Sequence, residues 1–139
     1  MFEQFGEHYL IDAYNVDYAR AYEPDFIVGF IERVVDSTNM RKLSSINVYR
    51  VEGNGLKDSG GVTGFVVVDE SHISVHTFPH RKFISADIYT CKVGTDTKAI
   101  DKAFIETFYP SQSEYVEYIE NTNTQLIQRG MRFPSEDLL

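Results

Sequence analysis

Two strand-forming runs follow one another with only two residues between them, and this junction restricts the fold more than any other feature. The runs, 62–69 and 72–78, are rich in β-branched and aromatic residues, and Glu70 and Ser71 separate them. So short a junction has room for a sharp turn but not for a helix. The chain is therefore expected to contain two adjacent strands that meet at a polar turn.

Helical periodicity appears twice in the chain, and the other apolar runs have the character of strands. After Pro24, apolar residues recur at the spacing of one helix face as far as Val35. Further strands are predicted at 9–16, 45–52, 84–91 and 115–119, and a second helix at 96–109. Glycine-rich 53–61 is expected to be a loop, and the tail from Asn121 is polar. This order predicts an α+β fold, with helices packed on one face of an antiparallel sheet.

Composition restricts the size of the fold and its partners. With 139 residues, 42% of them hydrophobic, the chain can bury one core, so 1–139 is expected to form a single domain. A net charge of −8 disfavours nucleic acid and anionic membranes, and favours a small-molecule partner. The sequence has no long apolar run and no signal-peptide pattern, which predicts a soluble cytoplasmic protein. The single cysteine, Cys91, and four scattered histidines match no disulfide or metal-site pattern, so no metal is expected.

Ser71 stands where one predicted strand ends and the next begins. If a strained turn holds it, its hydroxyl can attack the carbonyl of Glu70 and exchange the amide for an ester. Loss of the Ser71 α-proton would then expel the Glu70 carboxylate, and hydrolysis of the resulting dehydroalanine would leave a pyruvoyl group. Taken alone, the triplet from Glu70 to His72 is better explained by ordinary turn chemistry, since serine is common in turns.

The residues around this triplet form a longer and more specific pattern. The string Glu-Ser-His-Ile-Ser-Val-His-Thr occupies 70–77, Asp-Ile-Tyr-Thr-Cys occupies 87–91, and Gly-Val-Thr-Gly occupies 61–64. Gly-Glu-His at 6–8, followed by Asp12, completes the set. Together these residues resemble the bacterial type of S-adenosylmethionine decarboxylase, in its processing site, its cysteine-bearing strand and its opening strand. The resemblance implies the two-layer α+β sandwich of that family.

The resemblance also implies a self-made cofactor. Cleavage between Glu70 and Ser71 would give a β chain, 1–70, and an α chain, 71–139, whose N-terminal pyruvoyl group derives from Ser71. That group would form a Schiff base with the substrate amine and accept electrons as carbon dioxide leaves. The implied product is decarboxylated S-adenosylmethionine for spermidine and other polyamine synthesis. Members of the family assemble as dimers, so a homodimer of αβ units is expected.

Each further role implied by the resemblance has a simpler alternative. His76 matches the family's processing histidine, although a lone strand histidine is more often a structural hydrogen-bonder. Cys91 matches the proton donor, although a single cysteine in an apolar strand is commonly core packing. Thr63 stands where the family usually has a processing serine, and slower cleavage is one expected consequence. Asp12 replaces a glutamate close to the active site, or is a solvated strand-end carboxylate. His72 is expected only to shape the turn and not to transfer a proton in catalysis.

Two positions depart from the family where it recognises the nucleoside. Val51 stands nearest to an aromatic residue that stacks on adenine, and His80 replaces a glutamate that binds the ribose hydroxyls. S-adenosylmethionine remains the expected substrate. The alternative is a pyruvoyl-dependent decarboxylase of a basic amino acid, L-ornithine or L-arginine. An unprocessed, non-catalytic regulator and a small interaction domain without chemistry are further alternatives.

Overall fold

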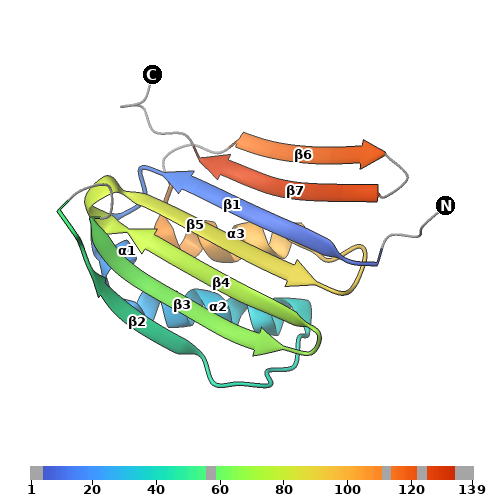
Figure 1. Cartoon of the computed structure of the whole chain (residues 1–139), viewed down its shortest axis with the longest axis horizontal. Helices are drawn as coiled ribbons and strands as arrows, with labels where there is room; N and C mark the ends of the chain where they lie inside the picture. Colours follow the sequence, from blue (N-terminus) through green and yellow to red (C-terminus); the bar gives the residue numbers. More distant parts are fainter. Residues whose placement is uncertain (1–4, 56–58, 111–113, 122–124, 134–139) are drawn as a thin grey trace.

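The strands form one mixed sheet, and the helices lie on a single face of it (Figure 1). The computed structural model describes residues 5–55, 59–110, 114–121 and 125–133, with side chains as far as residue 110. The described part of the sheet has the strand order β2-β3-β4-β5-β1-β7-β6. The elements are β1 Glu7–Tyr14, α1 Tyr18–Tyr22, α2 Pro24–Thr38, β2 Asn47–Glu52, β3 Gly60–Val68, β4 Ser71–Phe78, the 3₁₀ turn η1 Pro79–Arg81, β5 Phe83–Thr90, α3 Thr97–Phe108, β6 Glu114–Asn121 and β7 Gln125–Phe133.

Side-chain burial alternates along the central strands, and this alternation sets which face of each strand meets the helices. Along β3, β4 and β5, every second side chain is buried against the helices, as expected for strands with one covered face. α2 and α3 cover this face with the apolar stripes that the sequence predicted, and Phe30 of α2 meets Phe104 and Phe108 of α3 at ring-centroid distances of 5.5 and 5.6 Å. The core therefore lies between the sheet and these two helices.

The predicted α+β class is confirmed, and the sheet differs from the prediction at its C-terminal edge. Neighbouring strands from β2 through β5 to β1 are antiparallel, whereas β7 pairs with β1 in parallel. The polar tail from Asn121 did not predict β7, and the short elements α1 and η1 were also not predicted. Asp96 caps α3 as expected, accepting a hydrogen bond from the Ala99 N–H at 3.2 Å. Within the described residues, every helix is too short or too polar to cross a membrane.

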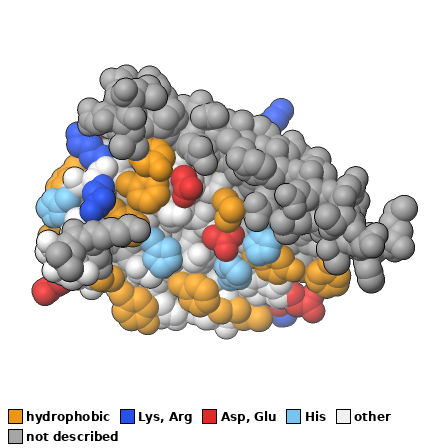
Figure 2. All heavy atoms as spheres, turned by 45° about the horizontal axis from the view of Figure 1, so that its top comes forward, with side chains coloured by type: hydrophobic (Ala, Val, Ile, Leu, Met, Phe, Trp, Pro, Cys, Tyr) orange, Lys and Arg blue, Asp and Glu red, His pale blue; other side chains and the backbone are white. Residues whose placement is uncertain are grey.

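In the described part of the chain, the other face of the sheet carries no helix, and we call it the open face. Large apolar side chains remain exposed on it, among them Leu10, Tyr49 and Phe65, with 38, 62 and 39% of their surface accessible. Figure 2 shows histidines and hydrophobic side chains gathered on this side of the molecule. Contiguous exposed apolar surface is a feature of interaction sites.

Candidate active site

The predicted cleavage site lies in a two-residue turn between β3 and β4. Val68 pairs with Ser71 across the hairpin, so Asp69 and Glu70 alone make the turn. Glu70 has a φ of 51°, in the left-handed region where a residue with a side chain pays about 1 kcal/mol or more. Ser71 is the first residue of β4, not a linker before it. The bond between Glu70 and Ser71 therefore joins a strained turn to a regular strand.

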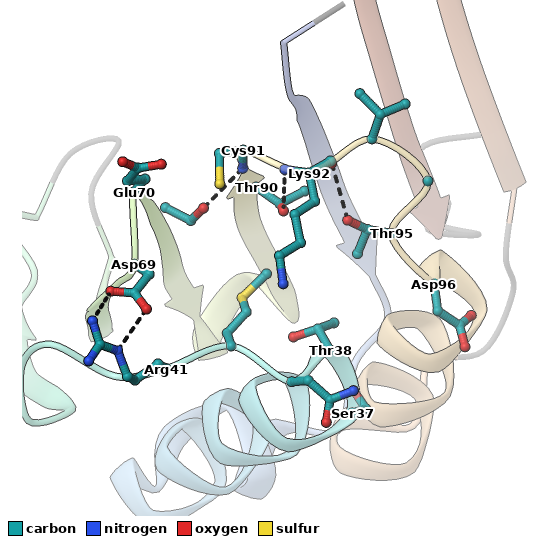
Figure 3. A pocket seen from close by; sticks show the side chains of 15 residues that line it. Ser37, Thr38, Arg41, Asp69, Glu70, Thr90, Cys91, Lys92, Thr95 and Asp96 are labelled. Atoms are coloured by element: carbon teal, nitrogen blue, oxygen red, sulfur yellow. Dashed lines mark hydrogen bonds and ion pairs between the residues drawn. The ribbon is translucent and has the colours of Figure 1, made fainter.

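Ser71 and Cys91 lie side by side at this end of the sheet. The Ser71 hydroxyl oxygen accepts a hydrogen bond from the Cys91 backbone N–H at 3.0 Å, and only 9% of Ser71 is exposed. Cys91 directly follows the last residue of β5. Both residues line a cavity of about 630 Å³ (Figure 3). Other lining residues include Glu70, Arg41, Asp69, Thr90 and Lys92.

Four other residues, three of them predicted and one newly recognised, form a row across the open face. In register, Thr63 of β3 lies opposite His76 of β4, His76 opposite Ser85 of β5, and Ser85 opposite Asp12 of β1. The Thr63 hydroxyl and His76 Nδ1 are 3.0 Å apart, and the Ser85 hydroxyl donates to Asp12 Oδ1 at 2.9 Å. The sequence did not indicate Ser85, because its role depends on strand register. We call these four residues the polar row.

The polar row and Ser71 are far apart within one chain. His76 is five residues along β4 from Ser71, a separation of about 17 Å at roughly 3.3 Å per residue. The odd number also places the two side chains on opposite faces, since Ser71 is buried and His76 is exposed. Within one protomer, His76 therefore cannot reach the Ser71 α-carbon.

Val51 and His80 lie at the end of the sheet away from Ser71. They line a second cavity, of about 260 Å³, together with Arg50, Glu52 and Tyr22. Its remaining lining residues are Gly53, Ser59, Gly60, Gly61 and Pro79. The Arg50 guanidinium lies 4.3 Å from the centre of the Tyr22 ring. The two positions that depart from the family pattern are thus brought together.

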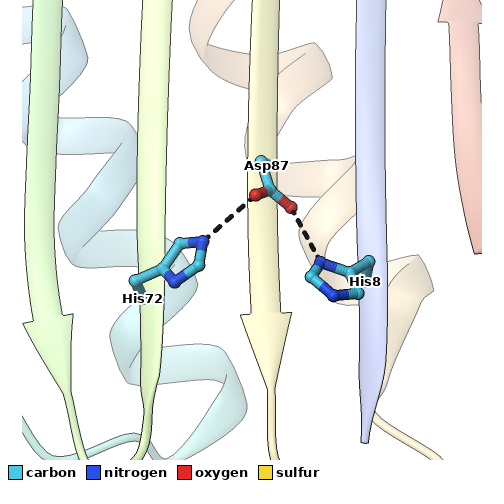
Figure 4. Close-up of polar contacts among 3 residues, drawn as sticks. All are labelled: His8, His72 and Asp87. Carbon is cyan, nitrogen blue, oxygen red and sulfur yellow. Dashed lines mark hydrogen bonds and ion pairs between the residues drawn. The ribbon is translucent and has the colours of Figure 1, made fainter.

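A carboxylate on the open face connects two histidines from neighbouring strands. Asp87 of β5 lies between His72 of β4 and His8 of β1 (Figure 4). His72 Nε2 is 3.1 Å from Asp87 Oδ2, and His8 Nδ1 is 3.6 Å from Oδ1. A carboxylate can only accept, so the first contact assigns a proton to His72 Nε2. Asp87 therefore fixes the ring of the residue that follows Ser71, which agrees with a shaping role for His72.

A buried carboxylate holds the loop that follows Cys91. Glu7 of β1 is 3% exposed, and its Oε1 accepts the Gly94 N–H at 3.0 Å. Gly94 has a φ of 84°, which glycine adopts without strain. Glu7 thus ties β1 to the wall of the larger cavity. The sequence pattern included Glu7 but did not predict that its side chain is buried.

Comparison with known proteins points to one family. The family model for S-adenosylmethionine decarboxylase matches residues 7–120. The S-adenosylmethionine decarboxylase proenzyme of Archaeoglobus fulgidus is 34% identical over 80% of this chain and 94% of its own length. The proenzyme of Pyrobaculum arsenaticum is 35% identical over 81% of this chain and 91% of its own length. The crystal structure of the adenosylmethionine decarboxylase of Aquifex aeolicus superposes with a TM-score of 0.66 at 27% identity, covering 80% of this chain and 86% of that one.

Proposed function

Because the chain belongs to the S-adenosylmethionine decarboxylase family, we propose that it is the self-cleaving precursor of a pyruvoyl-dependent S-adenosylmethionine decarboxylase. The observation that carries the proposal is the position of Ser71, which follows a left-handed Glu70 in a two-residue turn and shares a cavity with Cys91. The product of the mature enzyme, decarboxylated S-adenosylmethionine, would supply spermidine synthesis.

Self-cleavage would proceed at the bond between Glu70 and Ser71. The Ser71 hydroxyl adds to the Glu70 carbonyl carbon, its proton passes to the Ser71 nitrogen, and the C–N bond breaks to leave an ester and a free amine. Removal of the Ser71 α-proton breaks the Cβ–Oγ bond and releases Glu70 as a carboxylate. The remaining aminoacrylate takes up one water and loses one ammonia. The net reaction consumes water and gives chains 1–70 and 71–139.

The surroundings of Ser71 fit the pyruvoyl group that this reaction would leave. The Cys91 N–H, which now donates to the Ser71 hydroxyl at 3.0 Å, would face the new N-terminus of β4. The pyruvoyl group supplies an electron sink for the substrate carboxyl group as carbon dioxide departs. The Cys91 thiol borders the same cavity, and we assign it the proton that the substrate carbon regains after decarboxylation.

We further propose that the active protein is a homodimer in which each protomer acts on its partner. His76, with Thr63 as its hydrogen-bond partner, is suited to move the Ser71 α-proton, but it lies on the other face of its own sheet and about 17 Å away. Packing of two open faces would bury their exposed apolar side chains and can bring one polar row to the other protomer's turn. Asp12 would then reach the site with the row.

The intact mass of the purified full chain tests the cleavage. We expect two fragments divided between Glu70 and Ser71. The second should be lighter by one ammonia than simple hydrolysis would leave it, because pyruvoyl replaces its N-terminal serine. Ser71→Ala should give a single uncleaved mass. An uncleaved parent chain that releases no carbon dioxide from any candidate substrate would refute the proposal in favour of a non-catalytic regulator.

Co-expression of two defective chains tests the dimer. Ser71→Ala keeps His76 but lacks the nucleophile, and His76→Ala keeps the nucleophile but lacks the imidazole. Each variant alone should remain intact, whereas in a mixture the His76→Ala chain should be cleaved by its Ser71→Ala partner. If the His76→Ala chain stays intact in verified mixed dimers, the assignment of His76 to the partner's turn is wrong.

A second candidate substrate follows from the smaller cavity. Val51 has no ring to stack on adenine, and His80, beside Arg50, offers fewer acceptors to ribose hydroxyls than a carboxylate does. An L-ornithine or L-arginine decarboxylase with the same pyruvoyl chemistry is therefore the alternative. Carbon dioxide release from the three substrates, measured side by side on cleaved protein, decides between them.

A further inference from the structure

The connection between α2 and β2 lies along the last residues of β3. The Leu43 N–H donates to the Val67 carbonyl at 2.9 Å, and the Val67 N–H donates to the Ser44 hydroxyl at 3.1 Å. Lys42 and Val68 form an isolated antiparallel bridge. This segment therefore continues the sheet beside β3, up to the turn that contains the cleavage site.

Arg41 completes the contact by holding Asp69 through both main chain and side chain. The Asp69 N–H donates to the Arg41 carbonyl at 3.0 Å. The Arg41 Nε and Nη2 donate to the two Asp69 carboxylate oxygens at 2.7 and 2.8 Å (Figure 3). These paired hydrogen bonds hold the pKa of the Asp69 carboxyl below its usual value and raise the pKa of Arg41. Asp69 is thus held by three hydrogen bonds with one residue, two that it accepts and one that it donates.

The bond to be cleaved lies directly beyond this anchor. Glu70 is left-handed without being glycine, so its conformation has to be held by its neighbours. Arg41 holds the residue before it, and the Cys91 N–H holds the Ser71 hydroxyl after it. The Glu70 carbonyl therefore lies between two residues, Asp69 and Ser71, that hydrogen bonds hold in place. Small displacements of such a carbonyl change the rate of intramolecular attack strongly.

We infer that Arg41 is a positioning residue for self-cleavage, which holds Asp69 so that the Glu70 carbonyl stays within reach of the Ser71 hydroxyl. This inference rests on the proposed self-cleavage. The pair is solvent-exposed, with 75 and 48% of the two side chains accessible, so it adds little to the stability of the fold. Loss of the pair should therefore change the rate of cleavage and leave the stability of the fold unchanged.

Pulse–chase synthesis of the full chain in a cell-free system tests the inference, with intact and cleaved forms separated on a denaturing gel. Arg41→Gln and Asp69→Asn should each slow cleavage by about fivefold, the factor that about 1 kcal/mol of lost positioning produces. The double variant should cleave no more slowly than either single variant, because both remove the same contact. Arg41→Lys, which retains the charge and one hydrogen bond, should give an intermediate rate.

Lys102→Gln is the matched control, since Lys102 forms another exposed ion pair, with Glu106 at 4.0 Å, and its side chain is also 75% accessible. Its cleavage rate should equal that of the parent, and the melting temperatures of all variants, measured in a Ser71→Ala background, should agree within about 2 °C. Equal cleavage of Arg41→Gln and parent, or additive effects in the double variant, would overturn the inference while self-cleavage stands. An uncleaved parent would instead refute the proposed function.

Discussion

Asp101 on α3 is a carboxyl group whose burial and ionisation oppose each other. The Tyr9 hydroxyl, on a nearly inaccessible side chain of β1, donates to Asp101 Oδ1. Burial raises the pKa of Asp101, and the Tyr9 hydrogen bond only partly opposes the rise. A carboxyl with a raised folded-state pKa favours the folded state when protonated. Its contribution is therefore complete at low pH and is lost as the pH rises through that pKa.

Asp101→Asn should accordingly stabilise the protein at neutral and alkaline pH. Because the amide cannot ionise, the gain in melting temperature over the parent should be near zero at about pH 4 and clear at about pH 8. Thermal unfolding in the Ser71→Ala background measures this on a single chain. Tyr9→Phe, which removes the opposing hydrogen bond, should lose stability most at high pH, and a pH-independent difference in both variants would contradict this account.

Thr63 provides a second prediction at this scale, because its hydroxyl is 3.0 Å from His76 Nδ1. Thr63→Val keeps the shape and removes the hydroxyl, so cleavage should slow by at least about tenfold, while Thr63→Ser should cleave at least as fast as the parent. The fraction of intact chain over time, measured by mass spectrometry, distinguishes the two variants. Equal rates for valine and serine would remove Thr63 from the proposed processing machinery.

At the scale of elements, two glycines offer opposite outcomes for the same substitution. Gly29 lies within α2, and a Cβ there meets nothing within 4 Å, so Gly29→Ala should raise the melting temperature by about 3 °C through helix propensity. Gly61, the second residue of β3, has a φ of 157°, and a Cβ there would lie 1.8 Å from the Thr77 carbonyl oxygen. Gly61→Ala should therefore lower the melting temperature. Thermal unfolding in the Ser71→Ala background compares both, and a loss of stability in Gly29→Ala would contradict the packing of α2.

Elements with strong periodicity could be predicted from the sequence, and elements defined by their surroundings could not. α2 and α3 carry apolar stripes, and the β3–β4 hairpin alternates on either side of its turn. By contrast, α1 has five residues and depends on contacts such as the hydrogen bond from the Thr77 hydroxyl to the Ala21 carbonyl, at 2.8 Å. β7 depends on pairing with β1. Local pattern does not reveal partners that are distant in sequence.

The same limit applies to the candidate site. The string at 70–77 identified Ser71 and His76, and the resemblance added Cys91 and Thr63. Strand register decides that Ser71 and Cys91 share one cavity whereas His76 and Thr63 stand in another place. Register is a property of paired strands, so a sequence that names the residues does not by itself divide them into these groups.

At the scale of the whole molecule, the two expected chains are interleaved in one sheet. Chain 1–70 supplies β1 and β3, and chain 71–139 supplies β4, β5 and β7. Strand β1 lies between β5 and β7, and β3 pairs with β4. Cleaved protein should therefore elute as one species in native gel filtration and separate into two only in denaturant. Elution of a free 1–70 fragment under native conditions would contradict the described topology.

This interleaving means that a mature molecule cannot easily repeat its own folding. In the precursor, β1, β3 and β4 are tethered, so their mutual search is intramolecular and independent of concentration. Once the chain is cut, β1 and β3 belong to one molecule and β4 to another, and regaining the sheet becomes a second-order reaction. Diluted after unfolding, the mature pair would recover far more slowly than an uncleaved Ser71→Ala chain. The cut that would create the cofactor would thus also make refolding depend on protein concentration, so the mature assembly persists chiefly because its two chains do not separate.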